Sequence, residues 1–501
     1  GEEQNRTLAP PRAAPTGRTN MNSSAKNASD GLAAPARPAP LEVDVNTSLA
    51  SIASGGKDID ANNDVNNLSV LSKASYVSHR GFVPPERVTG WVNIVFIIIS
   101  DLVGTGIVGL PYTFAKLGWA VGATVLLLFG LLTVYAGLLL WRLHMTYPNG
   151  ITMGNIAESV SGKALMWFVF VIVYAHFFFK MSSYLLTAAK SVQTMLWMYD
   201  VCLYWASVGA IVFFFPICQL RTLHHISFVG VVSVTTIVIV MIILISQSFA
   251  TWDMRGIEGV VTNPLPTGTG YEGFVSGLSA MTSLVFAYGG QGMYLESMSE
   301  MRNPKDFPKA LYTFSSVIIF LYMSTSLMLY FRYGENSAGN ILFSMNNGAL
   351  KTVASTLMFL HVCVSFCLNA QLLTRALHVR LFPYSVNKGG AREALPWFGI
   401  TCGTLSLAWL VGNAIPFFSD LNGIISSLCV GPTTFGFPAL FYLLACRRNE
   451  KKVPWYELLV CSLMILIAVF FVLVGTSVDF VQIANDVKEL GAPFSCILVS
   501  N

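Results

Sequence analysis

Long apolar stretches alternate with short polar segments over most of the chain after residue 90. Eleven of these stretches have about 18 residues or more and are nearly free of charge, which is long enough to cross the hydrocarbon core of a bilayer as a helix. Their approximate limits are 91–117, 119–142, 164–196, 203–220, 224–248, 273–300, 310–332, 350–381, 396–415, 421–446 and 455–478. The pattern therefore predicts an all-α polytopic membrane protein.

The composition agrees with this class. Hydrophobic residues make up 54% of the chain and charged residues only 11%, whereas soluble domains contain about 25% charged residues. The start of the chain differs, because it is rich in Ala, Asn, Ser and Pro and too polar to bury a core. We predict a disordered cytosolic tail over 1–87, a membrane domain with the eleven helices over 88–478, and a short extracytosolic tail over 479–501.

The distribution of Lys and Arg predicts the orientation. If the N-terminus is cytosolic, the cytosolic loops and helix ends carry fourteen of these residues and the opposite ones carry six. Cytosolic loops hold the excess of positive charge, so we expect a cytosolic N-terminus and an extracytosolic C-terminus. The membrane is either the plasma membrane or an internal one of vacuolar or lysosomal type. Cys202 and Cys496 would then both lie outside, where a disulfide between them can form.

Glycine clusters interrupt two of the predicted spans. The first is GTGIVGLP at 104–111, in the middle of the first span. Free backbone groups at this depth are tolerated only where they are buried in protein or line a cavity. If spans one to five form a repeat, an inverted second repeat begins at the sixth span, and FAYGGQG at 286–292 interrupts that span at the corresponding place. Paired breaks predict a binding site at the middle of the membrane.

The physical chemistry of two such breaks favours a zwitterion. Half-helix N-termini offer unpaired N–H groups and a positive dipole end to a carboxylate. Unpaired carbonyls on the other halves can accept hydrogen bonds from an ammonium or bind a cation. An α-amino acid matches this arrangement, although other small zwitterions would also fit.

The same residues resemble the amino acid/auxin permease family, within the amino acid-polyamine-organocation superfamily. The segments at 104–111 and 286–292 are similar to the family patterns G-[AST]-G-[IL]-L-x-L-P and F-A-[FY]-x-G-x-G. EMRNPKDFPKA at 300–310 and HVCVSF at 361–366 resemble two further family patterns. The resemblance covers about 88–478, and it implies a five-plus-five inverted-repeat (LeuT-like) transporter fold with an eleventh helix, which takes up amino acids with protons or sodium.

The candidate substrate-binding residues lie at the two breaks. The Thr105 hydroxyl can reach the cavity between them, with helix packing as the alternative role. Tyr288 and Gln291 have comparable places in the second break, and the glycines would contribute backbone groups. The full set is Gly104, Thr105, Gly106, Ile107, Ala287, Tyr288, Gly289, Gly290 and Gln291.

Three residues are candidates for ion coupling. Asp101 is ionisable inside a span, which is typical of a proton or cation site, and a hydrogen bond to a neighbouring helix or a place near the cytosolic vestibule is an equal alternative. Histidine has a pKa range suited to proton coupling, which makes His361 a candidate, although a lone histidine in a membrane helix is more often a hydrogen-bonded packing residue. Ser365 matches a region where sodium-coupled relatives place hydroxyl ligands. Cysteines on the same helix are poor ligands for a hard cation, so we favour protons over sodium.

His176 and Lys180 lie one helical turn apart, so they share a face of the third span. Two positive charges on that face would repel each other. We therefore expect at least one of the two side chains to be neutral or solvated.

Together these features predict a secondary active transporter that moves amino acids by alternating access, with proton-coupled symport favoured. A sodium-coupled symporter, a non-transporting amino acid sensor and an auxin-like weak acid permease remain alternatives. The expected partners are an amino acid and the lipid bilayer, and no nucleic acid is needed to explain the basic loops. We expect no cofactor, no metal site and no enzyme activity, because the sequence has no CxxC, phosphate-loop, nucleophile-elbow or HExxH motif.

Overall fold

The computed structural model describes residues 87–219, 226–250, 262–266, 268, 270–386, 390–415, 418–490 and 496. Nearly all of the predicted N-terminal tail lies outside these residues. The chain separates into a unit at 1–68 and a second unit at 69–501, and the second contains every element described below. Regular structure in the described ranges is helical, apart from an isolated bridge between Thr89 and Met301.

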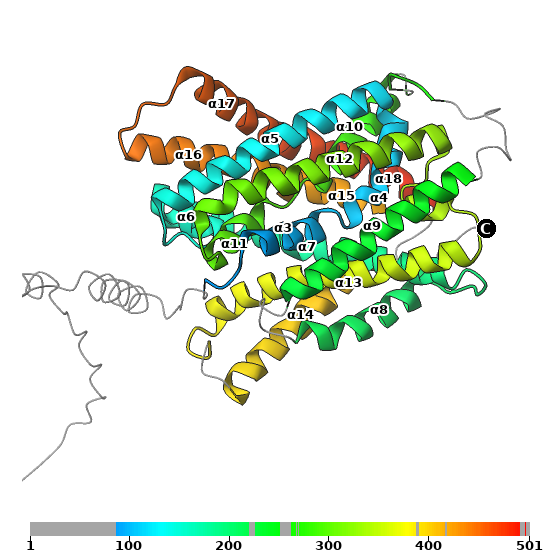
Figure 1. Cartoon of the computed structure of the whole chain (residues 1–501), viewed down its shortest axis with the longest axis horizontal. Helices are drawn as coiled ribbons and strands as arrows, with labels where there is room; N and C mark the ends of the chain where they lie inside the picture. Colours follow the sequence, from blue (N-terminus) through cyan, green and yellow to red (C-terminus); the bar gives the residue numbers. More distant parts are fainter. Residues whose placement is uncertain are drawn as a thin grey trace, which may run out of the picture. The chain divides into compact units, whose positions relative to one another are not determined.

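The helices follow the predicted apolar stretches in order (Figure 1). They are α3 (Trp91–Leu102), α4 (Thr105–Leu117), α5 (Trp119–Thr146), α6 (Met153–Ser161), α7 (Lys163–Met195), α8 (Leu203–Cys218), α9 (Ile226–Ala250), α10 (Gly270–Ala287), α11 (Tyr294–Glu300), α12 (Phe307–Tyr333), α13 (Ala349–Leu381), α14 (Ala391–Ala414), α15 (Phe418–Ile425), α16 (Phe437–Arg448), α17 (Trp455–Phe470) and α18 (Thr476–Leu490). Three π-helical segments, η7 (Ser426–Val430), η8 (Pro432–Gly436) and η9 (Phe471–Gly475), connect α15 to α16 and α17 to α18.

Most of the predicted spans are helices long and apolar enough to cross a membrane. Eight such helices are found in the described part of the chain, and the pair α3 and α4, bent by 51°, makes a ninth span. The predicted fourth span is the shorter α8, and the sixth is divided between α10 and α11. The last helix continues beyond the predicted end at 478. Its final turns are polar but remain helical as far as Leu490.

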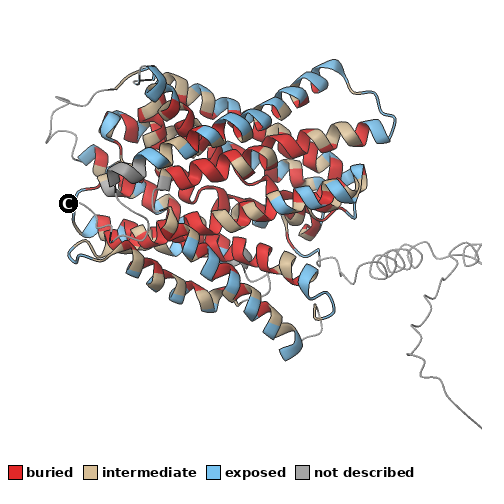
Figure 2. Ribbon diagram, turned by 180° about the vertical axis from the view of Figure 1, so that it is seen from behind, coloured by how far each residue is buried: buried red, intermediate tan, exposed pale blue. Residues whose placement is uncertain are grey.

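Buried residues lie in the middle of the bundle and exposed residues on its outside (Figure 2). Many of the exposed residues are large and apolar. Leu131, Phe320 and Leu466 are each more than half exposed. So many exposed apolar side chains are suited to contact with lipid. In the interior, the long helices α7 and α13 pack along each other, α3 packs against α9 and α12, and α4 packs against α10.

Both predicted breaks are present. In the first span the helix stops after Leu102 and begins again at Thr105, so only Val103 and Gly104 leave it. The glycine run suggested a longer break. However, α4 already begins at Thr105 and includes the rest of the run as far as Pro111. In the sixth span α10 ends at Ala287, and a 3₁₀ turn over Gln291–Met293 leads into α11.

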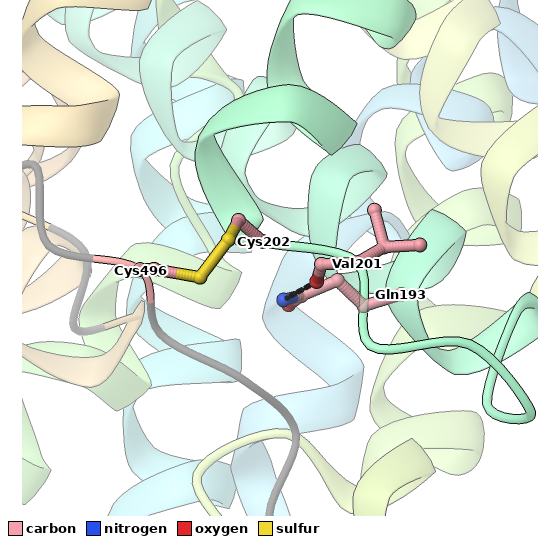
Figure 3. Close-up of a disulfide and its surroundings, with 4 residues drawn as sticks. All are labelled: Gln193, Val201, Cys202 and Cys496. Carbon is pink, nitrogen blue, oxygen red and sulfur yellow. Dashed lines mark hydrogen bonds between the residues drawn. A yellow bond between two sulfur atoms is a disulfide. The ribbon is translucent and has the colours of Figure 1, made fainter.

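A disulfide joins Cys202, next to the start of α8, to Cys496 near the end of the chain (Figure 3). The two Cα atoms are 4.9 Å apart although 294 residues separate them in the sequence. Close by, the Gln193 side-chain amide donates a hydrogen bond of 2.9 Å to the Val201 carbonyl. The pairing that the sequence allowed is therefore formed.

Candidate functional site

The two helix breaks are in direct contact. A Cβ atom on Gly106 would lie 2.7 Å from the Cα of Ala287, and one on Gly290 would lie 2.8 Å from a methyl carbon of Leu102. Real Cβ atoms essentially never come so close to other heavy atoms. Glycine at these two positions is therefore what allows the first and second breaks to touch.

One tyrosine of α12 forms hydrogen bonds with backbone carbonyls at both breaks. The Tyr322 hydroxyl lies 2.6 Å from the carbonyl oxygen of Leu102 and 2.9 Å from that of Ala287. These residues are the last ones of α3 and α10, so their carbonyls have no helical partner. Tyr322 is fully buried, and its phenol replaces the water that such carbonyls would otherwise need.

A buried ion pair also connects the breaks. The Lys180 ammonium, on α7, lies 2.6 Å from Oδ2 of Asp101 and 3.1 Å from the carbonyl oxygen of Gly289. The two side chains are only 4% and 1% exposed. One ammonium thus contacts a carboxylate just before the first break and a free carbonyl in the second.

The rest of the Asp101 carboxylate is also paired. Oδ1 accepts a hydrogen bond of 2.7 Å from the Asn369 amide, and the Tyr184 hydroxyl lies 3.2 Å away. The same hydroxyl is 2.7 Å from the Asp101 backbone carbonyl. A buried ion pair is tolerated only where such additional hydrogen bonds satisfy the remaining lone pairs.

The predicted substrate-binding residues are buried around this pair. The Thr105 hydroxyl and the Gln291 Nε2 have no hydrogen-bond partner among the described residues. The Gln291 Oε1 accepts hydrogen bonds from the Gly290 amide, at 3.1 Å, and from the Thr434 hydroxyl, at 2.9 Å. Buried polar groups without partners are rare, so these two are groups that a ligand could pair.

Ile107 and Tyr288 have contacts of a different kind. Ile107 is fully buried in the apolar core. The Tyr288 hydroxyl donates a hydrogen bond of 2.9 Å to the Leu126 carbonyl of α5, and its ring packs against that of Tyr322. The polar end of Tyr288 therefore holds the second break against α5.

The predicted ion-coupling residues all lie against α3 or the first break. Ser365 donates a hydrogen bond of 2.7 Å to the Ser100 carbonyl. Nδ1 of His361 is 2.9 Å from the Ser233 hydroxyl, whereas Nε2 is buried and has no hydrogen-bond partner in the part of the chain that the structure describes. A Cβ on Gly104 would be 3.5 Å from that Nε2, which places the imidazole beside the first break.

The sequence analysis missed Lys180 as a partner of Asp101. The sequence pattern associates Lys180 with His176 on the same helix face, but the His176 ring stacks on Phe177, and neither of its nitrogens has a hydrogen-bond partner among the described residues. Each member of the pair is an ionisable residue inside an otherwise apolar span, and such residues usually face the bundle interior and pair with one another. That signal could have identified the pair.

A cavity of about 570 Å³ lies beyond the second break, between α6, α7, α11 and α13. Its polar lining includes Glu296, Glu300, Arg375 and Arg380. The Tyr174 hydroxyl donates to Glu296 over 3.3 Å, and Arg375 lies 4.0 Å from Glu300. None of the predicted substrate-binding residues lines this cavity, so the breaks are closed off from it here.

Comparison with known families decides what kind of protein carries this arrangement. A family model described as transmembrane amino acid transporter protein matches residues 87–481. The chain belongs to this family. Its helical bundle is accordingly a membrane transporter of amino acids and not an enzyme.

Similar curated proteins are named as amino acid transport proteins. The N amino acid transport system protein of Neurospora crassa is 25% identical over 381 residues, which are 72% of this chain and 78% of that protein. Amino acid transporter AVT3A of Arabidopsis thaliana is 27% identical over 395 residues, 76% of this chain and 86% of the relative.

Solved transporters share the fold. A crystal structure of MhsT in complex with L-phenylalanine matches 79% of this chain and all of its own chain, with a TM-score of 0.54 and 14% identity. A manganese transporter of Eremococcus coleocola covers 80% of this chain and 91% of its own, with a TM-score of 0.53 and 13% identity. The predicted LeuT-like fold is confirmed.

Proposed function

We propose that this amino acid transporter is a proton-coupled symporter that works by alternating access and binds its substrate at the two helix breaks. The observation that carries the proposal is the position of the Lys180 ammonium between Asp101 and the Gly289 carbonyl. These oxygens would suit a free cation, but a fixed ammonium already fills the place between them. Only protons then need to enter or leave for the charge of the site to change.

The chemistry of coupling follows from the pair. A proton that binds Asp101 neutralises the carboxylate and ends its ionic contact with Lys180, which is left as a cation at the breaks. The substrate carboxylate can then pair with this ammonium and with free N–H groups at the start of α4, while its own ammonium approaches backbone carbonyls of the second break. Substrate and proton each raise the affinity of the other, as linkage requires.

The substrate leaves through the cavity lined by Glu296 and Arg375. In the orientation that the Lys and Arg distribution favours, α11 ends at the cytosol, so this cavity is the cytosolic vestibule. Amino acids would move toward the cytosol, either across a plasma membrane or out of a vacuole or lysosome. Opposite charges on its wall suit the passage of a zwitterion.

Transport into vesicles tests the proposal. Purified protein in proteoliposomes is given labelled amino acids under a pH gradient or a sodium gradient, with the membrane potential clamped. We expect accumulation driven by the pH gradient and unaffected by replacement of sodium with choline. Accumulation driven by sodium at constant pH would overturn proton coupling, and binding without flux would indicate a sensor. Competition by indole acids but not by alanine would indicate a weak acid permease.

A further inference from the structure

A second buried carboxylate lies far from the first along the chain. Asp479 on α18 is fully buried, and it faces α10 and the π-helical segment η7. Oδ1 lies 3.0 Å from the Thr282 hydroxyl of α10, and Oδ2 lies 2.9 Å from the Ser427 hydroxyl of η7. Among the described residues no Lys, Arg or His forms an ion pair with it. A charge buried with hydroxyl partners alone is costly, which favours a group that can also be neutral.

The hydroxyls of Thr282 and Ser427 can form hydrogen bonds with Asp479 in either of its protonation states. Thr282 Oγ1 is also 2.7 Å from the Ser279 carbonyl, and Ser427 Oγ is also 3.1 Å from the Gly423 carbonyl. When the carboxylate is ionised, both hydroxyls donate to it. When it is protonated, it donates to one hydroxyl, and that hydroxyl turns to the carbonyl on its own helix. No buried polar group of the cluster loses its partner in either state.

Glycines bring the helices close enough for this exchange. A Cβ on Gly423 would lie 2.8 Å from Oδ1 of Asp479, and a Cβ on Gly475 would lie 3.2 Å from side-chain carbons of both Ser427 and Thr282. The carboxyl group therefore sits where α10, α15 and α18 meet. Any larger side chain at Gly423 would push it away from Thr282.

Few other ionisable groups lie on the elements packed against α18. α10 carries Tyr271 and Glu272 in its first turn, α15 carries Asp420, and η7 carries Cys429. Asp420 is one turn from Gly423 and interacts electrostatically with Lys190 of α7. η9 has no ionisable residue. The hydrogen bonds that reach the Asp479 carboxylate within the described residues come from the hydroxyls of Thr282 and Ser427.

We propose that Asp479 is a second proton-binding site, separate from the pair of Asp101 and Lys180, and that its protonation loosens α10 from α18. The ionised carboxylate ties Thr282 to Ser427 with charge-assisted hydrogen bonds, which are about twice as strong as neutral ones. Thr282 is five residues before Ala287, where α10 ends at the second break. Proton binding at Asp479 therefore weakens a tether on the half-helix that leads to the substrate. The effect on transport rests on the proposed function, but proton binding itself does not.

Infrared spectroscopy of the purified full-length protein tests proton binding directly. The difference between acidic and alkaline spectra should contain the C=O band of a buried protonated carboxyl group. We expect this band to lose one component in Asp479→Asn and to be unchanged in Asp200→Asn, a matched change at an exposed loop carboxylate. An identical band in Asp479→Asn and the wild type would overturn the proposal, and so would a shift of the band when sodium replaces choline.

A second variant covers the case in which Asp479→Asn does not fold. Thr282→Val keeps the acid and removes one donor to its ionised form, so the protonated band should persist to higher pH. A band with unchanged pH dependence would contradict the site. Because these measurements need no transport, failure of the infrared test and failure of uptake in vesicles are distinguishable. Where uptake is measured, Asp479→Asn should weaken its pH dependence while Asp200→Asn leaves it intact.

Discussion

The ammonium of Lys180 lies 2.6 Å from the carboxylate of Asp101, across the interface between α7 and α3. The contact joins a long unbroken helix to the half-helix that ends at the first break. Because the same ammonium is 3.1 Å from the Gly289 carbonyl, movement of either half-helix changes its surroundings. A single charged group of α7 is thus coupled to both halves of the candidate site.

Removal of the Lys180 ammonium alone should destabilise the protein more than removal of both charges of the ion pair. Lys180→Met leaves a buried carboxylate without its countercharge, which costs about 3–5 kcal/mol of stability. The double variant Asp101→Asn with Lys180→Met should recover much of that stability but no coupled uptake. Thermal unfolding of the purified proteins measures the first effect and vesicle uptake the second.

Lys116→Met is a suitable control, because Lys116 is partly exposed and lies over the Tyr112 ring. We expect it to unfold and transport much as the wild type does. Equal stability of Lys180→Met and Lys116→Met would show that the ion pair does not stabilise the purified protein.

Alanine at Gly106 should block transport without preventing membrane insertion. The added Cβ would lie 2.7 Å from the Cα of Ala287, and a backbone atom cannot move aside as the end of a side chain can. We expect uptake to fall by at least about tenfold, equivalent to about 1.4 kcal/mol. Gly403→Ala on α14 is the control, because nothing lies within 4 Å of a Cβ there. Normal uptake by Gly106→Ala, at equal surface expression, would refute close contact of the breaks.

Loss of the Tyr322 hydroxyl alone should lower both the stability of the protein and its uptake of substrate. Tyr322→Phe keeps the packing but leaves the carbonyls of Leu102 and Ala287 without their donor. A buried polar group without a partner costs about 1–3 kcal/mol, so the unfolding temperature should fall and uptake should decrease. Tyr312→Phe on the same helix, at a position 53% exposed, should change neither. If the two variants unfold at the same temperature, the shared hydrogen bond does not stabilise the breaks.

The sequence predicted local features of this site well and contacts between helices poorly. Glycine lowers the cost of leaving a helix, so both breaks were visible as runs of glycine. The pairing of Asp101 with Lys180 depends on how α3 packs against α7, and helical periodicity identifies only neighbours on one helix, such as His176. Tyr322 was equally hidden, because the apolar pattern of α12 does not separate it from the exposed Tyr312.

The disulfide of Cys202 and Cys496 offers a test of orientation as well as of stability. It closes a loop of 294 residues, so its loss should destabilise the protein by up to about 5 kcal/mol, with a smaller effect if the unfolded chain stays compact. Cys202→Ser, Cys496→Ser and the reduced wild type should therefore unfold at similar, lowered temperatures. Cys402→Ser is the control, because Cys402 is unpaired and only partly buried.

In right-side-out vesicles, a membrane-impermeant maleimide should label Cys202 and Cys496 after reduction and not before. This result is expected because disulfides persist in oxidising compartments, which lie on the extracytosolic side of the membrane. Labelling only in inside-out vesicles would reverse the orientation inferred from Lys and Arg. The cavity lined by Glu296 and Arg375 would then open away from the cytosol, and the direction of amino acid movement would have to be reversed with it.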